Sequence, residues 1–357
     1  MPTSAVGTAP ADAAPGKMIT MRPVQIVLLG YGPVARDFMA LVGERDQDLR
    51  RRYGVALAVT GIRAESQEVI LRPGVTGPEA VPARDAWAPA GDLGAFLAAG
   101  AGSIAVQAIP SGDRLVDTAT TQVLAAFDAG MDVVTATKTH LVRHWDVLAE
   151  AAIRTGRRVR ISGATGAALP AADVARVSLR GFSCRAIRGS LNGTSSFVLE
   201  QLGSGGSLAD AVRVAQSRGI AEADPWSDLD GRDAASKLVL LANLLWGLGA
   251  SIDAVEREPI DESTAARAAE AARAGRRLRA VARADVETGR LDVRFEALEP
   301  GDPLFPLSGP EKAVAYDCGV VGQIVVSGGR SSPRGAAQAM LKDLLGLALE
   351  AGPGGFD

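Results

Sequence analysis

The residues from Ala221 to Leu241, AEADPWSDLDGRDAASKLVLL, place five carboxylates in front of a lysine that leads into an apolar run. Asp233 and Lys237 are one helical turn apart, so their side chains are neighbours on one face of a predicted helix. That face continues through Leu241 and Leu245, which puts the lysine on an apolar stripe. A lysine on such a stripe is partly removed from water and needs acidic partners. The pattern predicts a lysine that could exchange a proton with a substrate oxygen.

Other interpretations of this stretch are weaker. An exposed ion pair between Asp233 and Lys237 would contribute only about 0.3 kcal/mol, and the apolar stripe argues against it. Asp230 stands before the helix and is expected to cap it. The run from Asp228 to Gly231 resembles part of a calcium loop. The closing glutamate of such a loop would fall on Lys237, which excludes an EF-hand.

A second candidate site follows a predicted strand at Val24–Leu29, where GYGPVA fits the pattern G-x-G-x-x-A. In this pattern the first glycine permits a tight turn, the second lets the backbone approach a pyrophosphate, and the alanine allows helix and strand to pack closely. The amides that open the following helix would face the phosphates. The strand before the turn and the helix after it favour a dinucleotide site over a purely structural turn. The predicted contacts are Gly30, Gly32, Pro33, Val34 and Ala35.

The second predicted strand, Val55–Ile62, is followed by Arg63. An acid at this place would bind the 2′-hydroxyl of the adenosine ribose, whereas an arginine suits a 2′-phosphate. Arg63 therefore favours NADP slightly over NAD. A solvated loop charge is an equally good interpretation of the same residue.

Two further predicted strands end at the same edge of the sheet. One spans Ser103–Pro110, and the other ends near Thr135–Lys138. The carboxyl ends of parallel strands form the ligand edge of an open α/β sheet. Lys138 is therefore a candidate functional residue, with an ordinary surface charge as the alternative.

The composition is typical of a soluble globular protein without a nucleic-acid partner. The chain has 357 residues and a net charge of −3, whereas nucleic-acid binders usually carry a basic surplus. Its two cysteines have neither metal nor disulfide spacing and suit a reducing cytoplasm, and two histidines leave little material for a metal site. No apolar run reaches the roughly 20 residues of a membrane span. Residues 1–21 lack a signal-peptide pattern and predict a disordered tail.

The order of predicted elements indicates an α/β fold with two domains. Alternating strands and helices in residues 22–160 predict a Rossmann-type nucleotide-binding domain. Residues 161–325 predict a second, α+β domain with an open mixed sheet, including a hairpin at VETG. Residues 326–357 predict a loop and a final helix. In the second domain, Asn192, Gly193 and Thr194 could receive a polar ligand at a helix start, or Asn192 or Thr194 could simply cap that helix.

Taken together, these segments resemble homoserine dehydrogenase, in the same order from roughly Val24 to Leu345. GYGPVA resembles the nucleotide turn of that family, ATKTHLV its short lysine segment, GATGAALP its glycine-rich segment and SLNGTSSFVLEQL its Asn-Gly-Thr segment. The closest similarity is AQSRGIAEADPWSDLDGRDAASKL, which follows the family pattern of Ala-Glu-x-Asp-Pro, Asp, Gly, Asp and Lys. The resemblance is to a short form without a kinase or ACT-type regulatory domain.

The resemblance implies an oxidoreductase of amino-acid biosynthesis that uses NADP or NAD to interconvert L-aspartate 4-semialdehyde and L-homoserine. Lys237 would protonate the aldehyde oxygen, oriented by Asp233, and Lys138 would lie near the nicotinamide. The implied substrate-binding residues are Glu222, Asp228, Gly193 and Thr194. Cofactor contacts are implied, besides the glycine turn and Arg63, for Ile109, Pro110, Lys138 and Gly328.

The resemblance also implies a monovalent cation and a partner. Homoserine dehydrogenases bind the cation through main-chain oxygens, which here would belong to Ser162, Thr165, Ala167 and Leu169. The second domain would form a homodimer through its sheet, and residues 326–357 would return to the nucleotide-binding domain.

Several positions depart from the family pattern: the closing loop Gly328–Ser332, the strand end Ile109–Pro110, Thr137 in place of asparagine, and Ser195–Ser196. These changes leave open a relative that acts on a different small aldehyde or amino alcohol. A nucleotide-binding sensor or partner protein without catalysis is a third hypothesis, against which the two retained lysines argue.

Overall fold

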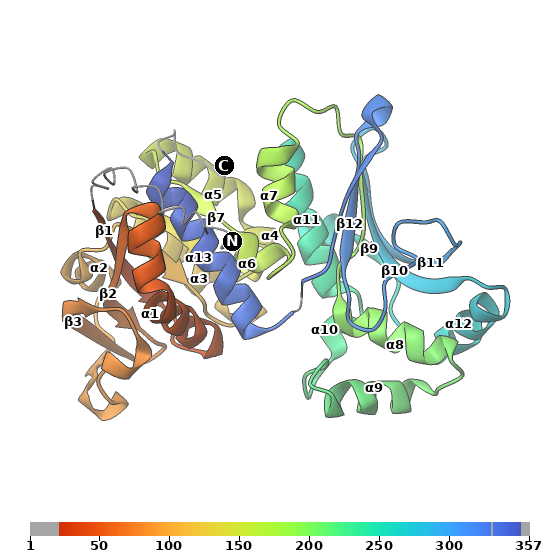
Figure 1. Ribbon diagram of the computed structural model, residues 1–357, viewed down its shortest axis with the longest axis horizontal. Coiled ribbons are helices and arrows are strands. Elements are labelled where there is room, and N and C mark those ends of the chain that lie inside the picture. The colour runs from red at the N-terminus through yellow and green to blue at the C-terminus, as the bar shows by residue number, and fades with distance from the viewer. Residues whose placement is uncertain (1–20, 330, 351–357) are drawn as a thin grey trace, which may run out of the picture.

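The computed structural model describes residues 21–329 and 331–350, which form two lobes, each built on one β-sheet (Figure 1). Most of the predicted tail, Arg330 of the closing loop and residues 351–357 lie outside the described residues. The strands of the first lobe are β1 (Arg22–Leu29), β2 (Val55–Arg63), β3 (Gln67–Val75), β4 (Ala88–Pro89), β5 (Ile104–Gln107), β6 (Asp132–Thr135) and β7 (Val159–Arg160).

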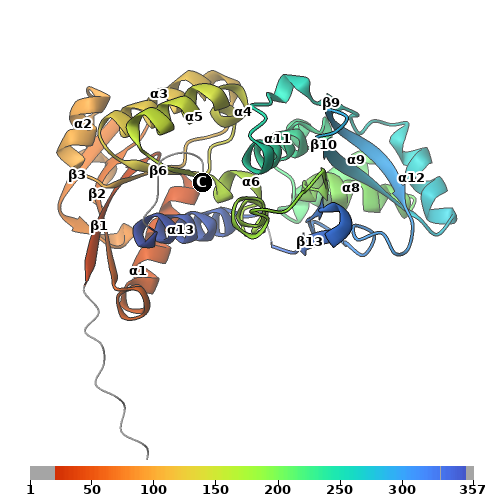
Figure 2. The same cartoon turned by 90° about the horizontal axis from the view of Figure 1, so that it is seen from above.

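The first sheet has the spatial order β4-β3-β2-β1-β5-β6-β7. Strands β2, β1, β5, β6 and β7 are parallel, and β3 and β4 add an antiparallel edge. The order reverses between β1 and β5, and such a switch point opens a crevice at the carboxyl ends of the strands. Helices cover both faces of the sheet (Figure 2), which explains the almost unbroken apolar run of β1.

The helices of the first lobe lie in two layers (Figure 2). On one face are α1 (Pro33–Tyr53) and α13 (Pro333–Leu349), and on the other are α2 (Leu93–Gly100), α3 (Val116–Asp128), α4 (Thr139–Arg143) and α5 (Trp145–Thr155). The last helix of the chain thus packs against the first one. Met340 and Leu344 of α13 share a buried cluster with Ile26 and Phe38.

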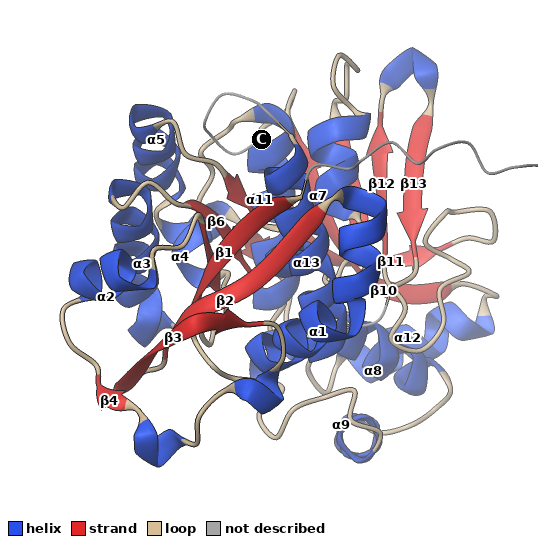
Figure 3. Cartoon of the chain, turned by 60° about the vertical axis from the view of Figure 1, so that its left-hand side comes forward, coloured by secondary structure: helices blue, strands red, loops and turns tan. Residues whose placement is uncertain are grey.

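The second lobe has a six-stranded mixed sheet in the order β13-β12-β8-β10-β11-β9. Its strands are β8 (Ala186–Ser190), β9 (Glu256–Arg257), β10 (Arg277–Asp285), β11 (Arg290–Leu298), β12 (Ala313–Asp317) and β13 (Gln323–Ser327). The predicted VETG hairpin joins β10 to β11 in antiparallel register. Figure 3 shows β12 and β13 side by side at the far side of the molecule from β3. Both sheets agree with the predicted α/β fold class.

The helices of the second lobe include α8 (Gly193–Gly203), α9 (Leu208–Ser217), α10 (Trp226–Leu229), α11 (Arg232–Trp246) and α12 (Thr264–Arg273). One face of the sheet packs in the main core with these helices, for example through Ile187 and Ala282. The opposite face carries Arg188 and Glu296, whose charged groups are 2.5 Å apart. That face also holds a small buried cluster in which Val281 and Ala313 pack with Leu304 and Leu307. The alternation along these strands therefore separates the main core on one face from charged pairs and this smaller cluster on the other.

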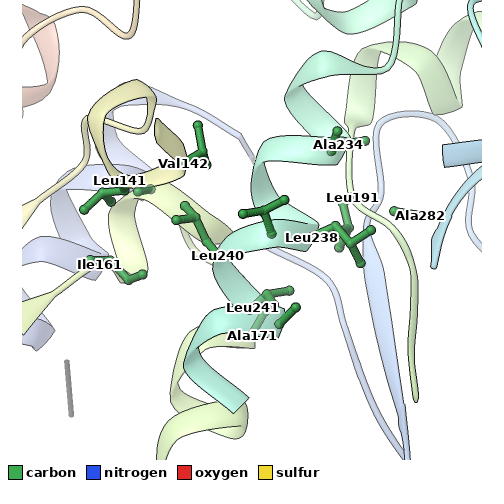
Figure 4. Close-up of a cluster of buried hydrophobic side chains, with 14 of the residues drawn as sticks. Leu141, Val142, Ile161, Ala171, Leu191, Ala234, Leu238, Leu240, Leu241 and Ala282 are labelled. Atoms are coloured by element: carbon green, nitrogen blue, oxygen red, sulfur yellow. The ribbon is translucent and has the colours of Figure 1, made fainter. Parts of the chain in front are cut away.

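Helix α11 lies between the two lobes (Figure 4). Leu240 points toward Leu141 of α4, in the first lobe, whereas Leu238 lies beside Leu191 and Ala282 of the second. All of these side chains are buried. Residues 161–185 connect the lobes and contain α6 (Ser162–Thr165) and α7 (Ala171–Asp173). The helix that carries Lys237 is therefore held by apolar contacts on both sides.

The two cysteines of the chain are neighbours in the folded protein. Cys184 and Cys318 are free and buried, and their Sγ atoms lie 2.6 Å apart. They are separated by 134 positions in the chain, so their spacing in the sequence does not indicate that they are close in space.

Within the described part of the chain, none of the helices combines the length and the apolar character needed to cross a membrane.

Candidate active site

Two lysines, one from each lobe, meet at the carboxylate of Asp233. The Nζ of Lys138, which follows β6, lies 2.7 Å from Asp233 Oδ1, and the Nζ of Lys237 lies 2.5 Å from Asp233 Oδ2. Asp233 and Lys237 are neighbours on α11, one turn apart as expected. Lys237 is buried, which excludes the exposed ion pair. Asp230 accepts from the Arg232 amide at the start of α11.

Asn192 joins the acids of the site. Its Nδ2 donates to Asp228 Oδ1 at 2.6 Å and to Asp233 Oδ2 at 2.7 Å. Its Oδ1 accepts from the Ser195 amide at 2.8 Å, so Asn192 also caps α8. A helix cap was one of the two interpretations that the sequence offered for this residue. The side chain is buried and uses both amide hydrogens and its oxygen. The side chain that caps α8 therefore also holds the carboxylates of Asp228 and Asp233 at a fixed separation.

The charges of the site shift one another's pKa. Burial alone would raise the pKa of Asp233, but the ammonium groups of Lys138 and Lys237 hold it well below its ordinary range. The Asp233 charge raises the pKa of Lys138 against the opposing effect of burial. Burial, followed by the Asp233 charge, raises the pKa of Asp228. Asp233 is therefore the anion on which the cluster depends.

Lys138 lies at the carboxyl edge of the first sheet, as predicted. Its amide donates to Ser111 Oγ at 2.9 Å. The preceding residue, Thr137, donates from Oγ1 to Ile109 O at 2.8 Å and accepts from the Ile109 amide at 3.1 Å. Thr137 thus ties the end of β6 to the residues after β5. Ile109, next to Pro110, and Lys138 consequently border the same part of the crevice.

The glycine turn after β1 fits a dinucleotide. Gly30 has a φ of 105°, and a Cβ on it would lie 2.4 Å from Ala108 O, so only glycine is accommodated. A Cβ on Gly32 would meet nothing within 4 Å, which leaves open space beside the turn. Helix α1 starts at Pro33 with no side-chain cap and no acid in its first turn. Its amides are available to a pyrophosphate.

Arg63 is held at the end of β2. Its Nη1 lies 2.6 Å from Glu68 Oε2, and its Nη2 donates to Gly91 O at 2.7 Å. Only 16% of its side chain is exposed, so it is not a solvated loop charge. The guanidinium is ordered near the position of the adenosine ribose in a Rossmann domain, with an acid beside it.

The predicted substrate-binding residues lie at different depths. Asp228 is in the centre of the cluster, whereas Glu222 is exposed at its rim and acts through its charge, which contributes to the raised pKa of Lys138. Gly193 and Thr194 begin α8 directly after Asn192, and Thr194 Oγ1 donates to Ile220 O at 3.1 Å.

The glycine-rich loop, residues 162–169, receives a lysine that was not predicted. Lys312 precedes β12, is 1% exposed and donates from Nζ to Gly166 O at 2.8 Å. Burial and then the Lys237 charge lower the pKa of Lys312 to about 7. The main-chain oxygens expected to bind a monovalent cation therefore adjoin an amine of the chain itself, in surroundings that disfavour positive charge.

The closing loop rests on the same segment. The Gly328 amide donates to Lys312 O at 3.0 Å. A Cβ on Gly329 would lie 2.6 Å from the Leu169 amide nitrogen, so the two backbones touch. Gly328 is thus placed beside the glycine-rich loop, at the boundary between the lobes.

Sequence reasoning missed three contributions: the bridging role of Asn192, Lys312, and Asp343 of α13. Asp343 is buried and accepts from both the amide and the hydroxyl of Ser162, each at 2.8 Å. For Lys312 and Asp343 the sequence does contain a pattern that could have indicated burial. Lys312 is in phase with the buried Val314 and Tyr316 of β12, and Asp343 interrupts the apolar run of a helix.

A Rossmann-type lobe with an open glycine turn, facing a buried lysine–aspartate–lysine cluster, defines a nucleotide-dependent oxidoreductase. The sequence profile of the homoserine dehydrogenase family matches residues 170–345. The homoserine dehydrogenase of Corynebacterium glutamicum is 31% identical over 333 residues, which cover 91% of this chain and 72% of the relative. The chain belongs to the homoserine dehydrogenase family.

Two further similarities extend this result. The NAD(+)-dependent homoserine dehydrogenase of Pseudomonas canavaninivorans is 29% identical over 339 residues, 91% of this chain and 96% of the relative. The structure is similar to that of a hyperthermophilic archaeal homoserine dehydrogenase in complex with NADPH, with a TM-score of 0.75 at 22% identity, over 93% of this chain and 99% of the other. The second similarity confirms the predicted fold.

Proposed function

We propose that this protein interconverts L-aspartate 4-semialdehyde and L-homoserine with NAD or NADP. The single observation that carries the proposal is the meeting of Lys138 and Lys237 on Asp233 at the ligand edge of the first sheet. Family membership supplies the substrate, and the open turn at Gly32 supplies a place for the cofactor.

Lys237 is the proposed proton donor and acceptor. An ammonium group has three N–H donors. One is used by Asp233 at 2.5 Å and one by Leu191 O at 2.9 Å, which leaves the third for a substrate oxygen. Asp233 and the buried helix face fix the direction of that donor. A proton delivered from Lys237 neutralises the alkoxide that would otherwise form on the aldehyde oxygen.

The cofactor would be held by the glycine turn, by the edge around Ile109 and Pro110, and by the closing loop at Gly328. Bound NAD(P) supplies or accepts the hydride at the substrate carbon. Lys138 would lie beside the nicotinamide, and its link to Asp233 keeps the two lobes in register around it. Of the two cofactors we propose a slight preference for NADP, because Arg63 can turn from Glu68 to a 2′-phosphate.

The carboxylates beside the lysines suit the amino group of the substrate. Asp228 lies at the centre of the cluster, Glu222 lies at its rim, and Gly193 and Thr194 would close the pocket at the start of α8. We also propose that Ser195–Ser196 and the closing loop allow a variant of this activity, on a different small aldehyde or amino alcohol, as the second candidate.

We further propose a homodimer that forms through the sheet of the second lobe, on the face that carries Arg188. We also propose a cytoplasmic location, which suits the two free thiols. On that face Arg188 is paired with both Glu296 and Asp302. Exposed Val320 and Val325 extend it at the β12–β13 hairpin. Light scattering of the purified protein is expected to give twice the mass of the chain, and the mass of one chain would rule the dimer out.

The test of the function is the rate at which reduced nicotinamide forms from L-homoserine with NAD or NADP. Wild type is expected to turn over, and Lys237→Ala is expected to lose roughly 10²–10⁴-fold in kcat. Arg213→Ala, on the exposed face of α9, is the control, and it should keep the wild-type rate. No turnover of homoserine by wild type, with NADPH still bound, would reject the proposal, and a panel of small aldehydes with NADPH would then test the second candidate. Turnover that requires Lys237 rejects a non-catalytic nucleotide-binding role.

A further inference from the structure

Lys312 connects the second sheet to the loop between the lobes. Its position just before β12 puts its side chain on the same face of the sheet as Val314 and Tyr316. The Nζ of Lys312 donates to Gly166 O at 2.8 Å, and the hydroxyl of Tyr316 donates to Ala171 O at 2.8 Å. Two side chains from the same face of the second sheet therefore bind the segment that connects the lobes, one at Gly166 and one at Ala171.

The same loop is held from the first lobe by a buried acid. Asp343 of α13 accepts from the amide and from the hydroxyl of Ser162. The glycine-rich loop thus has an anionic side chain at its start and a cationic one near its middle. Both side chains are at most 2% exposed, so neither contact competes with bulk water.

Besides burial, two lysines and one aspartate act on the pKa of Lys312. The charges of Lys237 and Lys138 act on it in the direction that lowers its pKa, and Asp233 acts in the opposite direction. Within the described residues, no cluster of three or more acidic, histidine or cysteine side chains is arranged to hold a metal ion. An additional cation near Lys312 would be repelled by these basic groups. The buried acid of the loop, Asp343, is already paired with Lys342 and Ser162.

Two of the four main-chain oxygens expected to bind a cation accept hydrogen bonds from the chain itself. Ser162 O accepts from Thr165 Oγ1 at 3.2 Å, and Leu169 O accepts from the Ala171 amide at 2.8 Å. Gly166 O, between the expected cation ligands, accepts from Lys312. The amine can make this contact in either protonation state, because a neutral amine is also a donor.

We propose that the side chain of Lys312 takes the place of a monovalent cation at the glycine-rich loop, so that this enzyme needs no such cation. Lys312 is then a positioning residue. It holds residues 162–169 against the second lobe, and Leu169 in turn supports Gly329 of the closing loop. An effect of Lys312 on turnover rests on the proposed function. Its role in holding residues 162–169 in place does not.

The first experiment compares cations at equal ionic strength. The initial rate of L-homoserine oxidation by wild type is expected to agree within about twofold in choline, sodium and potassium chloride, and its melting temperature is expected to be the same in all three. A cation that binds only the folded protein would raise the melting temperature by mass action. A tenfold activation or a clear rise in melting temperature with sodium or potassium would overturn the proposal.

The second experiment uses Lys312→Met, which keeps the length of the side chain and removes the amine. In choline this variant is expected to lose at least about tenfold in kcat and to melt below wild type, and sodium or potassium should restore part of both. Arg213→Met is the matched control and should respond as wild type does. A Lys312→Met enzyme as active and as stable as wild type in choline would overturn the proposal. If wild type does not oxidise homoserine at all, the function fails, but the melting temperatures still decide the role of Lys312.

Discussion

Lys138 and Lys237 belong to different lobes, and their ammonium groups contact the two oxygens of the same carboxylate. Neither lobe by itself contains this arrangement. The site therefore depends on how α11 docks against α4, a contact made by apolar side chains such as Leu240 and Leu141 (Figure 4). Chemistry and lobe packing are coupled through one acid, Asp233.

Asp233→Asn is expected to damage both activity and stability. The amide keeps the shape of the side chain but leaves two ammonium groups without their anion. Removing one partner of a buried ion pair costs about 3–5 kcal/mol, and kcat should fall by about 10²-fold or more because Lys237 loses its orientation. Urea unfolding and steady-state kinetics measure the two effects. Asp210→Asn, at an exposed pair on α9, should change neither, and a fully active Asp233→Asn enzyme would remove Asp233 from the mechanism.

Two alanine substitutions in the glycine turn should have opposite effects. Gly30→Ala forces a Cβ to within 2.4 Å of Ala108 O in a backbone with φ of 105°, so we expect a loss of folding stability. Gly32 has a φ of −81° and open space around it, so Gly32→Ala should melt like wild type and bind NADPH at least about tenfold more weakly. Thermal melting and fluorescence titration with NADPH separate the two. Unchanged NADPH affinity in Gly32→Ala would place the cofactor elsewhere.

Cofactor choice should depend on the pair formed by Arg63 and Glu68. Arg63→Ala is expected to raise the KM for NADP about tenfold, which corresponds to about 1.4 kcal/mol, with little change for NAD. Glu68→Gln should favour NADP, because it frees the guanidinium for a 2′-phosphate. The ratio of kcat/KM for the two cofactors is the measurement. Equal losses with both cofactors would show that the pair only supports the end of β2.

Acid is expected to destabilise the protein in part through His140 of α4. This side chain is fully buried, and among the described residues neither ring nitrogen has a hydrogen-bond partner. Burial, with a smaller effect of the His144 charge, lowers the pKa of His140 from 6.5 to about 3. Between these values the unfolded chain binds the proton and the folded one does not. Stability therefore falls as the pH drops through this range, by about 5 kcal/mol when complete.

His140→Phe removes this titration, so the free energy of unfolding should depend less on pH between neutral and acid conditions. Urea unfolding at several pH values tests it, with His144→Gln as the matched control. If His140→Phe and wild type lose stability in parallel as the pH falls, another group is responsible.

Local pairings in this protein could be predicted from sequence, and pairings between lobes could not. Asp233 and Lys237 lie in one helix, where spacing determines which side chains are neighbours. The Lys138–Asp233 contact spans 95 positions and depends on lobe docking, for which no local pattern exists. The same holds for Lys312 and Gly166, which are 146 positions apart.

The strands and turns were predictable where one physical constraint dominated. Gly30, the apolar run of β1 and the β10–β11 hairpin each follow from local sterics or from burial on known faces. Arg63 had two interpretations because its outcome depended on Glu68, a partner across a turn. Asn192 was expected as a cap, and its contacts to Asp228 and Asp233 come from elements that only the tertiary fold brings together.

The return of α13 to the first lobe has a consequence for synthesis of the chain. Ala337, Met340, Leu341, Leu344 and Leu347 complete the cluster that surrounds Ile26 and Leu28. A ribosome makes the strands of that lobe first and its final helix last. The lobe that emerges first must therefore wait, with the part of its sheet beside α1 that α13 covers still exposed, until residues 333–349 have been translated.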